Sequence, residues 1–173
     1  MADEFLIAAL NADATDKVVA LYRAAAGGGG LARAPDEIDE AYVGKFLEAA
    51  SRDGIGRAVF ARDGTLIGEI HAQRMTPRQF RHVLTDLTVA VHPDWQGKGL
   101  GSLLFAQLIA AARETVPPIT RIELFAREGN MGAIRPLSAH GLQDRGPVRG
   151  ARPIAGRQDR GRHRDGFDIT AEL

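Results

Sequence analysis

The chain has 173 residues, of which 45% are hydrophobic, and its 22 basic and 22 acidic residues leave no formal net charge. This length suits one domain with a substantial core, and we expect a single domain over residues 1–173. The balanced charge argues against a dedicated nucleic-acid or membrane-surface protein. The chain has no cysteine, which excludes disulfides, thiolate metal sites and a cysteine nucleophile. The first residues lack the apolar run of a signal peptide or membrane span, so we expect a soluble, cytoplasmic protein.

The N-terminal region predicts one strand followed by two helices. Phe5 to Leu10 is short and mostly apolar, as in a strand. A helix is predicted from about Asp16 to Ala26, and Gly27–Gly30 ends it with a flexible joint. A second amphipathic helix is predicted over Asp36–Ala50, where large apolar side chains recur at helical spacing.

Three strands follow, and the first two form a predicted hairpin. Gly56–Arg62 and Thr65–Gln73 are joined by Asp63-Gly64, a pair typical of a tight turn. Strict alternation along the second strand predicts two faces, with Ile67, Glu69 and His71 on one and Leu66, Gly68 and Ile70 on the other. The third strand, Arg81–Val91, is rich in β-branched residues and fits a buried position in the sheet.

A glycine-rich loop separates this third strand from the next helix. Pro93 ends the strand, and Gly97, Gly99 and Gly101 fall on alternate positions, which allows a tight turn with uncrowded backbone N–H groups. A helix is predicted from Ser102 to about Arg113. Its N-terminus presents unpaired N–H groups and the positive end of the helix dipole, so the segment can hold an anion such as a pyrophosphate. The alternative is a turn that only connects a strand to a helix.

The spacing of the loop distinguishes among phosphate-binding motifs. Lys98 is followed by glycine rather than Ser or Thr, so the nucleoside-triphosphate pattern is missing, and the dinucleotide pattern Gly-x-Gly-x-x-Gly is missing too. The segment Gln96-Gly-Lys-Gly-Leu-Gly101, with Val91-His-Pro-Asp-Trp95 in front, resembles the Gln/Arg-x-x-Gly-x-Gly/Ala motif of the GNAT acyltransferase superfamily. The resemblance implies the GNAT fold, an α/β (α+β) mixed central sheet flanked by helices in the order β-α-α-β-β-β-α-β-α-β-β.

In this family the loop amides bind the pyrophosphate of acetyl-CoA, and the preceding strand pairs with the pantetheine. The resemblance therefore implies acetyl-CoA as a cosubstrate and no metal. The cofactor-binding residues that it implies are Val89, Ala90, Val91, Gln96, Gly97, Lys98, Gly99, Leu100, Gly101, Ser102 and Asn130. Asn130 belongs to an Asn-x-x-Ala-Ile pattern that opens the last helix in family members, and its alternative role is that of a plain helix cap.

The C-terminal part departs from the family pattern. Strands are predicted over Ile119–Ala126 and Gly166–Leu173. Pro136 falls where the last helix should run, and proline disrupts a helix interior. Leu137 takes the place of a tyrosine that many family members use to protonate the leaving thiolate. The resemblance therefore does not assign a catalytic acid.

Acetyl transfer to an amine needs an oxyanion site and, for an amine with a pKa near 10, a base. In this family a backbone N–H of the central strand, here within Val89–Val91, meets the oxyanion. Asp86 is our first choice for the base, since phosphinothricin-type members carry a carboxylate five residues before the equivalent of Val91. Its rivals are Glu69, His71 and Glu123. For each of these residues, the alternative is a strand side chain satisfied at the sheet surface.

These patterns predict an acetyl-CoA-dependent N-acetyltransferase that acts by direct transfer on the amine of a small molecule or amino-acid-like acceptor. The alternatives are a protein or peptide N-acetyltransferase and a catalytically silent acyl-CoA-binding GNAT domain. The expected partners are a small-molecule amine acceptor and, if the chain assembles, a second copy in a homodimer; neither nucleic acid nor a membrane is expected. The arginine-rich segment Arg145–Arg164 has no interleaved aromatic residue for base stacking, so we interpret it as a solvated loop.

Overall fold

The structure is a computed structural model that describes residues 5–27, 31, 33–127, 143–147 and 166–173. The elements in this part of the chain are β1 (Phe5–Ala9), α1 (Thr15–Gly27), α2 (Glu40–Asp53), β2 (Gly54–Ala61), β3 (Leu66–Arg74), β4 (Val83–Val91), α3 (Leu100–Arg113), β5 (Arg121–Arg127), β6 (Gln143–Pro147) and β7 (Gly166–Glu172). They confirm the predicted α/β fold, with element ends shifted by a few residues. The helix predicted to open at Asn130 lies outside the described residues.

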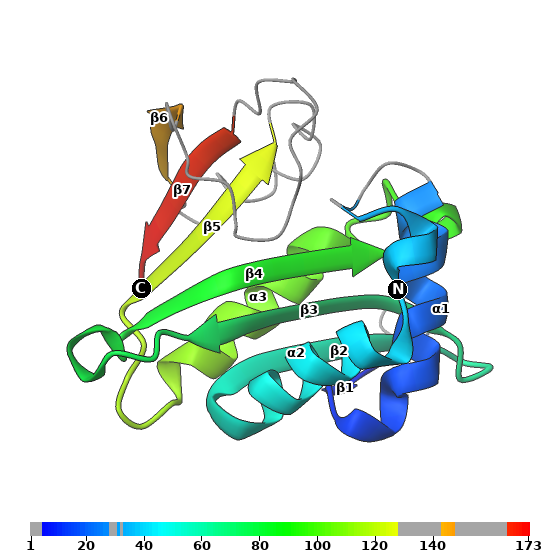
Figure 1. Cartoon of the computed structure of the whole chain (residues 1–173), viewed down its shortest axis with the longest axis horizontal. Coiled ribbons are helices and arrows are strands. Elements are labelled where there is room, and N and C mark those ends of the chain that lie inside the picture. Colours follow the sequence, from blue (N-terminus) through cyan, green and yellow to red (C-terminus); the bar gives the residue numbers. More distant parts are fainter. Residues whose placement is uncertain (1–4, 28–30, 32, 128–142, 148–165) are drawn as a thin grey trace.

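All the described strands belong to one sheet, in the order β1-β2-β3-β4-β5-β7-β6. Neighbouring strands are antiparallel, except that β4 and β5 run parallel. Helices α1 and α2 cover one face of the sheet and α3 covers the other (Figure 1). Each face has its own cluster of buried apolar side chains, so the central strands are buried on both sides.

Helix α2 begins later than the sequence predicts. Apolar spacing suggested a start at Asp36, but Pro35–Glu37 forms a separate 3₁₀ turn and Asp39 caps the helix. An Asp39 carboxylate oxygen accepts the backbone N–H of Tyr42 at 2.7 Å, which satisfies a donor that has no partner inside the helix. The buried face of α2 then consists of Val43, Phe46, Leu47 and Ala50.

The alternation predicted for β3 is wrong at its N-terminal end. The pairing with β2 passes directly from Leu66 to Gly68, which leaves Ile67 as an extra residue. Because of this β-bulge, Ile67 packs in the cluster under α3 and not on the face of Glu69, and Leu66 packs under α1 and α2. Glu69 and His71 do share a face, since both lie against α1.

Strands β4 and β5 pair only at their N-terminal ends. The parallel register consists of two residue pairs, Val83 with Arg121 and Leu84 with Ile122. Both strands continue beyond these pairs and diverge (Figure 1). The edge of β4 that follows Leu84 therefore has no hydrogen-bonding partner in β5.

A second β-bulge coincides with the point at which these strands part. On the β3 side the pairing passes from Thr85 to Thr88, so Asp86 and Leu87 together oppose one residue of β3. Asp86 has a φ of 51°, in the left-handed region that residues other than glycine rarely adopt. A bulge bends its own strand, which turns the C-terminal half of β4 away from β5.

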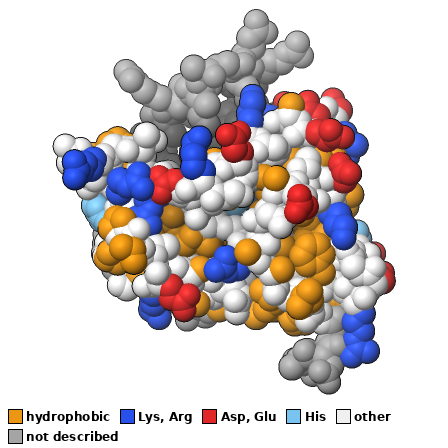
Figure 2. All heavy atoms as spheres, turned by 90° about the horizontal axis from the view of Figure 1, so that it is seen from below, with side chains coloured by type: hydrophobic (Ala, Val, Ile, Leu, Met, Phe, Trp, Pro, Cys, Tyr) orange, Lys and Arg blue, Asp and Glu red, His pale blue; other side chains and the backbone are white. Residues whose placement is uncertain are grey.

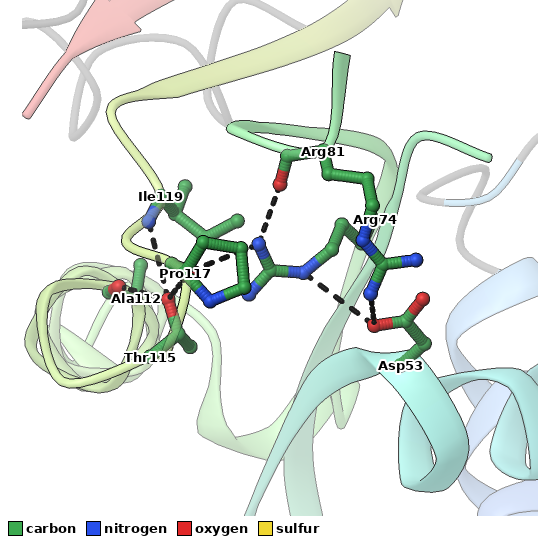
Figure 3. A network of polar contacts seen from close by, with 7 residues as sticks. All are labelled: Asp53, Arg74, Arg81, Ala112, Thr115, Pro117 and Ile119. Atoms are coloured by element: carbon green, nitrogen blue, oxygen red, sulfur yellow. Dashed lines mark hydrogen bonds and ion pairs between the residues drawn. The ribbon is translucent and has the colours of Figure 1, made fainter. Parts of the chain in front are cut away.

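Arg74 holds together the end of the sheet at which β4 and β5 pair. Its guanidinium donates to the carbonyl oxygens of Arg81 and Pro117, and its Nε lies 3.5 Å from Oδ1 of Asp53 (Figure 3). The Arg74 side chain is only 6% exposed. Arg81 also pairs with Asp53, at 2.8 Å. One arginine thus ties the end of α2 to the β3–β4 and α3–β5 connections.

Replacing Arg74 with methionine should lower the free energy of unfolding by about 2 kcal/mol, because two carbonyl oxygens and Asp53 lose a charged donor. Chemical denaturation followed by circular dichroism measures the change. The control is Arg52→Met on α2, where Glu48 is the one ion-pair partner of Arg52 among the described residues and the two side chains are 74% and 78% exposed. The control should change the same free energy by less than about 0.5 kcal/mol. Equal losses in the two variants would contradict the role of Arg74.

Candidate functional site

The glycine loop connects the C-terminal end of β4 to α3. A 3₁₀ turn at Pro93–Trp95 follows the strand. Gly97 and Gly99 then have φ angles of 73° and 82°, in the left-handed region. A side chain in that region costs roughly 1–2 kcal/mol, which accounts for glycine at both positions. Gly99 is also the N-cap of α3, and no side chain caps the helix there.

The loop and the first turn of α3 carry backbone N–H groups that have no acceptor among the described residues. The first N–H of α3 with an acceptor is that of Leu103, which donates to the Gly99 carbonyl oxygen at 3.0 Å. Within the described residues, no N–H from Gly97 to Ser102 donates to a carbonyl or a side chain. This row lies at the positive end of the α3 dipole, so it forms a site for a phosphate-type anion.

Gly101 leaves open space at the start of α3. A Cβ built on it would meet no protein atom within 4 Å, and its backbone is helical. Packing therefore does not require glycine here, although glycine in a helix is less favourable than alanine by up to about 1 kcal/mol. Open space beside free N–H groups is what the close approach of a diphosphate to the backbone requires.

Lys98 adds a positive charge to the loop. Its ammonium nitrogen lies 4.8 Å from the centre of the Trp95 ring, a cation–π contact. Among the described residues, Lys98 has no carboxylate partner. Its charge is therefore available to an anionic ligand.

The free edge of β4 adjoins the loop. The backbone N–H of His92 donates to the carbonyl oxygen of Ile67 in β3 at 2.9 Å. Because successive peptide groups of a strand point to opposite edges, those of Val91 and Val89 point toward the other edge of β4, which β5 leaves unpaired. The side-chain amide of Gln96 donates to the Val91 carbonyl oxygen at 3.1 Å. Gln96 thus ties the loop to the end of the strand, a contact that the spacing of the motif does not predict.

Asp86, the first choice for the base, lies in the bulge of β4. Its side chain is exposed, and within the described part of the chain it has no hydrogen bond or ion pair. A carboxylate without protein partners, beside the point where β4 leaves β5, is able to accept a proton from a ligand.

Glu69, the alternative base, lies in a buried cluster with Tyr22 and His71. Glu69 and Tyr22 are fully buried and His71 is 3% exposed. The Tyr22 hydroxyl donates to Glu69, and Nδ1 of His71 lies 3.3 Å from both Glu69 carboxylate oxygens. Phe46 of α2 stacks on the His71 ring, with 4.1 Å between ring centres. The sequence placed Glu69 and His71 on one face but did not identify Tyr22, whose only signal is its position on the apolar face of α1.

The remaining residues singled out in the sequence are Glu123, Asn130, Pro136 and Leu137. The third rival for the base, Glu123, forms an ion pair with Arg121, with 2.6 Å between Oε1 and Nη2. Asn130, Pro136 and Leu137 lie outside the described residues. Across the residues that the structure does describe, no group of three or more His, Asp or Glu side chains is placed to hold a metal ion.

The surface carries both signs of charge. On the face shown in Figure 2, Lys and Arg side chains lie interspersed with Asp and Glu side chains, and hydrophobic side chains lie between them. None of the described helices is both long and apolar enough to cross a membrane.

Comparison with known proteins identifies the family. The sequence model of the acetyltransferase (GNAT) family matches residues 15–141, which include the glycine loop and the free edge of β4. The chain belongs to the GNAT family. The family resemblance inferred from the sequence is therefore confirmed, and a comparison with curated proteins gave no match.

Solved GNAT structures share this fold over almost the whole chain. A ribosomal-protein-alanine N-acetyltransferase from Brucella melitensis is 24% identical, with a TM-score of 0.78 and coverage of 97% of this chain and 99% of that one. A GNAT acetyltransferase from Streptococcus pneumoniae is 22% identical, with a TM-score of 0.77 and coverage of 98% and 100%. A phosphinothricin acetyltransferase from Sinorhizobium meliloti, in complex with AcCoA, is 18% identical, with a TM-score of 0.77 and coverage of 98% and 89%.

The burial of Tyr22 leads us to expect that this GNAT protein loses stability at alkaline pH. Burial, and then the Glu69 carboxylate, raise the pKa of the Tyr22 phenol well above its ordinary value of 10.0. Above pH 10.0 the Tyr22 phenol releases its proton in the unfolded chain, while the folded protein keeps it. The free energy of unfolding should therefore fall by about 1.4 kcal/mol per pH unit from this group, and Tyr22→Phe should remove that slope.

Absorbance tests the same prediction directly. The chain has two tyrosines, so in Tyr42→Phe the phenolate signal comes from Tyr22 alone. We expect this signal to rise only together with the loss of circular dichroism. A phenolate that forms reversibly near pH 10 in the folded protein would contradict the buried contact with Glu69.

Proposed function

We propose that this GNAT-family protein is an acetyl-CoA-dependent N-acetyltransferase that acts on the amine of a small molecule. The observation that carries the proposal is the row of free N–H groups from Gly97 to Ser102 beside the unpaired edge of β4. Donors at a helix start suit a diphosphate, and a strand edge suits an amide-containing arm. The N–H row and the strand edge lie on one continuous stretch of chain, so a single ligand that carries both a diphosphate and an amide-containing arm could contact both.

The residues present fit acetyl-CoA. The N–H groups of Gly97–Ser102 and the ammonium of Lys98 would hold its pyrophosphate, and the peptide groups of Val89 and Val91 would pair with its pantetheine arm. When bound, acetyl-CoA supplies an activated acetyl thioester. A backbone N–H of Val89–Val91 would stabilise the negative charge that develops on the acetyl oxygen. Holding the thioester and the amine side by side supplies much of the rate through orientation.

The proton of the attacking amine must also be removed. An alkyl amine with a pKa near 10 is mostly charged at neutral pH. We propose Asp86 as the base, directly or through a water molecule, because its carboxylate is exposed and has no partner among the described residues. Glu69 is the alternative, and its carboxylate is already engaged by Tyr22 and His71 beneath α1.

Two other functions compete with this proposal. One structural neighbour is a ribosomal-protein-alanine N-acetyltransferase, so a protein or peptide acceptor is the nearest rival. A catalytically silent acyl-CoA binder is the second, because Leu137 replaces the tyrosine that many family members use as an acid. Release of free thiol in the presence of amines or of peptides separates the three functions. The chain has no cysteine, so a thiol reagent would report the product alone.

Gly101→Ala tests the cofactor site independently of catalysis. The new methyl group meets no protein atom within 4 Å, so the free energy of unfolding should stay equal or rise slightly. The affinity for acetyl-CoA, measured by calorimetry, should fall about tenfold or more because the methyl group occupies space that the diphosphate needs. The control is Gly44→Ala in α2, where a Cβ also meets no protein atom. Unchanged affinity in Gly101→Ala, or no acetyl-CoA binding to the unaltered protein, would overturn the cofactor assignment.

Asp86→Asn tests the base. Asparagine also tolerates a left-handed backbone, so the bulge should persist. We expect kcat to fall by about 100-fold or more while the affinity for acetyl-CoA stays the same. Glu69→Gln serves as the comparison: if it abolishes turnover and Asp86→Asn does not, Glu69 is the base.

A further inference from the structure

A polar groove lies beside α2, on the sheet face that α1 and α2 cover. Its volume is about 620 Å³, and it lies between α2, the segment before it and the end of β3. The lining residues on which the argument depends are Arg33, Glu37, Asp39, Tyr42, Lys45 and Gln73. The family match and the cofactor site assign no role to this groove.

Neither cation of the groove has a carboxylate partner in the part of the chain that the structure describes. The Arg33 guanidinium lies over the ring of Tyr42, with 4.1 Å between its central carbon and the ring centre. This stacking fixes the plane of the guanidinium and leaves its N–H edge open. Among the described residues, neither Arg33 nor Lys45 has a carboxylate within ion-pair distance. The positive charge of both side chains is therefore uncompensated by a direct contact.

The two acids of the groove are already engaged. Asp39 accepts the backbone N–H of Tyr42 at 2.7 Å, and Glu37 accepts the backbone N–H of Ala34 at 2.9 Å. Both carboxylates therefore serve the local backbone, as helix and turn caps do. The formal charges of the groove cancel, and the N–H donors of Arg33 and Lys45 are its charged groups that no hydrogen bond engages within the described residues. An anionic group is the complement.

Strand pairing links one end of the groove to the strand that carries the proposed base. Gln73, which lines it, pairs across the sheet with Thr85 of β4. Thr85 immediately precedes Asp86, in the bulge where β4 leaves β5. Neighbouring strands lie about 4.8 Å apart, so the end of the groove at Gln73 is one strand away from the proposed base.

We propose that this groove binds the carboxylate of the acceptor, and that the substrate class is therefore amino carboxylates, meaning free amino acids and close analogues. Arg33, with its fork of N–H donors, and Lys45 hold the carboxylate, while the amine points to Asp86 and the free edge of β4. The amine displaces the thiolate of CoA from the acetyl carbon, an amide bond forms as the thioester bond breaks, and the base takes the amine proton. This inference rests on the proposed function and narrows its acceptor.

Matched acceptors test the proposal. Thiol release is measured for a panel of amino acids, for their carboxamides, and for the amines that lack the carboxyl group. The amino acids should have kcat/KM values at least about tenfold above those of their neutral counterparts, the gain of one charge-assisted hydrogen bond. Arg33→Met and Lys45→Met should each raise the KM for amino acids about tenfold with little change in kcat, because the contact is made equally before and during reaction. Neither change should affect the carboxamides.

Two controls make the outcomes separable. Arg52→Met removes one positive charge from α2 outside the groove, and should leave every KM unchanged. Acetyl-CoA binding is measured first. If acetyl-CoA does not bind, the proposed function fails and this inference fails with it. If acetyl-CoA binds and the carboxamides or amines are used as well as the amino acids, the groove does not select carboxylates and only this inference is overturned. If acetyl-CoA binds and no member of the panel is acetylated, the small-molecule acceptor of the proposed function fails together with this inference.

Discussion

The early end of the parallel pairing between β4 and β5 is the constraint on which the rest of the site depends. Two residue pairs hold these strands together, and beyond Leu84 the edge of β4 has no partner in β5. A strand edge inside a sheet is normally satisfied by its neighbour, so its free donors and acceptors mark a place for a ligand. The bulge at Asp86 bends β4 at the parting point, and Arg74 secures the connections at the paired end.

Backbone N–H groups provide a row of hydrogen-bond donors at the proposed cofactor site. Gly97 and Gly99 adopt left-handed angles that deliver the chain to α3 without a capping side chain. The described residues offer this N–H row no acceptor, and unpaired donors lose hydrogen-bonding energy unless water or a ligand replaces the missing partner. Gln96 contributes differently, because its side chain ties the loop to Val91 and so fixes the row relative to the strand.

The opposite face of the sheet is organised by a buried polar cluster. Tyr22 joins α1 to Glu69, and Phe46 joins α2 to His71 by stacking. A buried carboxylate without partners costs free energy, so the contacts of Glu69 with Tyr22 and His71 stabilise the folded state. Together with the Phe46 stacking, they hold α1 and α2 over β3. Phe46 and Tyr42 also pack against each other, with 5.6 Å between ring centres, so the wall of the groove is continuous with the cluster. The position of the proposed acceptor groove thus depends on the contacts of this buried cluster.

The sequence by itself determined the glycine loop, the presence of a helix after it and the family, because glycine spacing, a proline stop and helical periodicity act within a few neighbouring residues. Only the tertiary structure decided which side chains meet. The extra residue at Ile67 moved one side chain to the other face, and no local pattern marks such a bulge. The contacts of Tyr22 with Glu69 and of Arg74 with Pro117 join residues more than forty positions apart. Such contacts follow from strand register and helix packing, which depend on the whole folded chain and not on any short stretch of it.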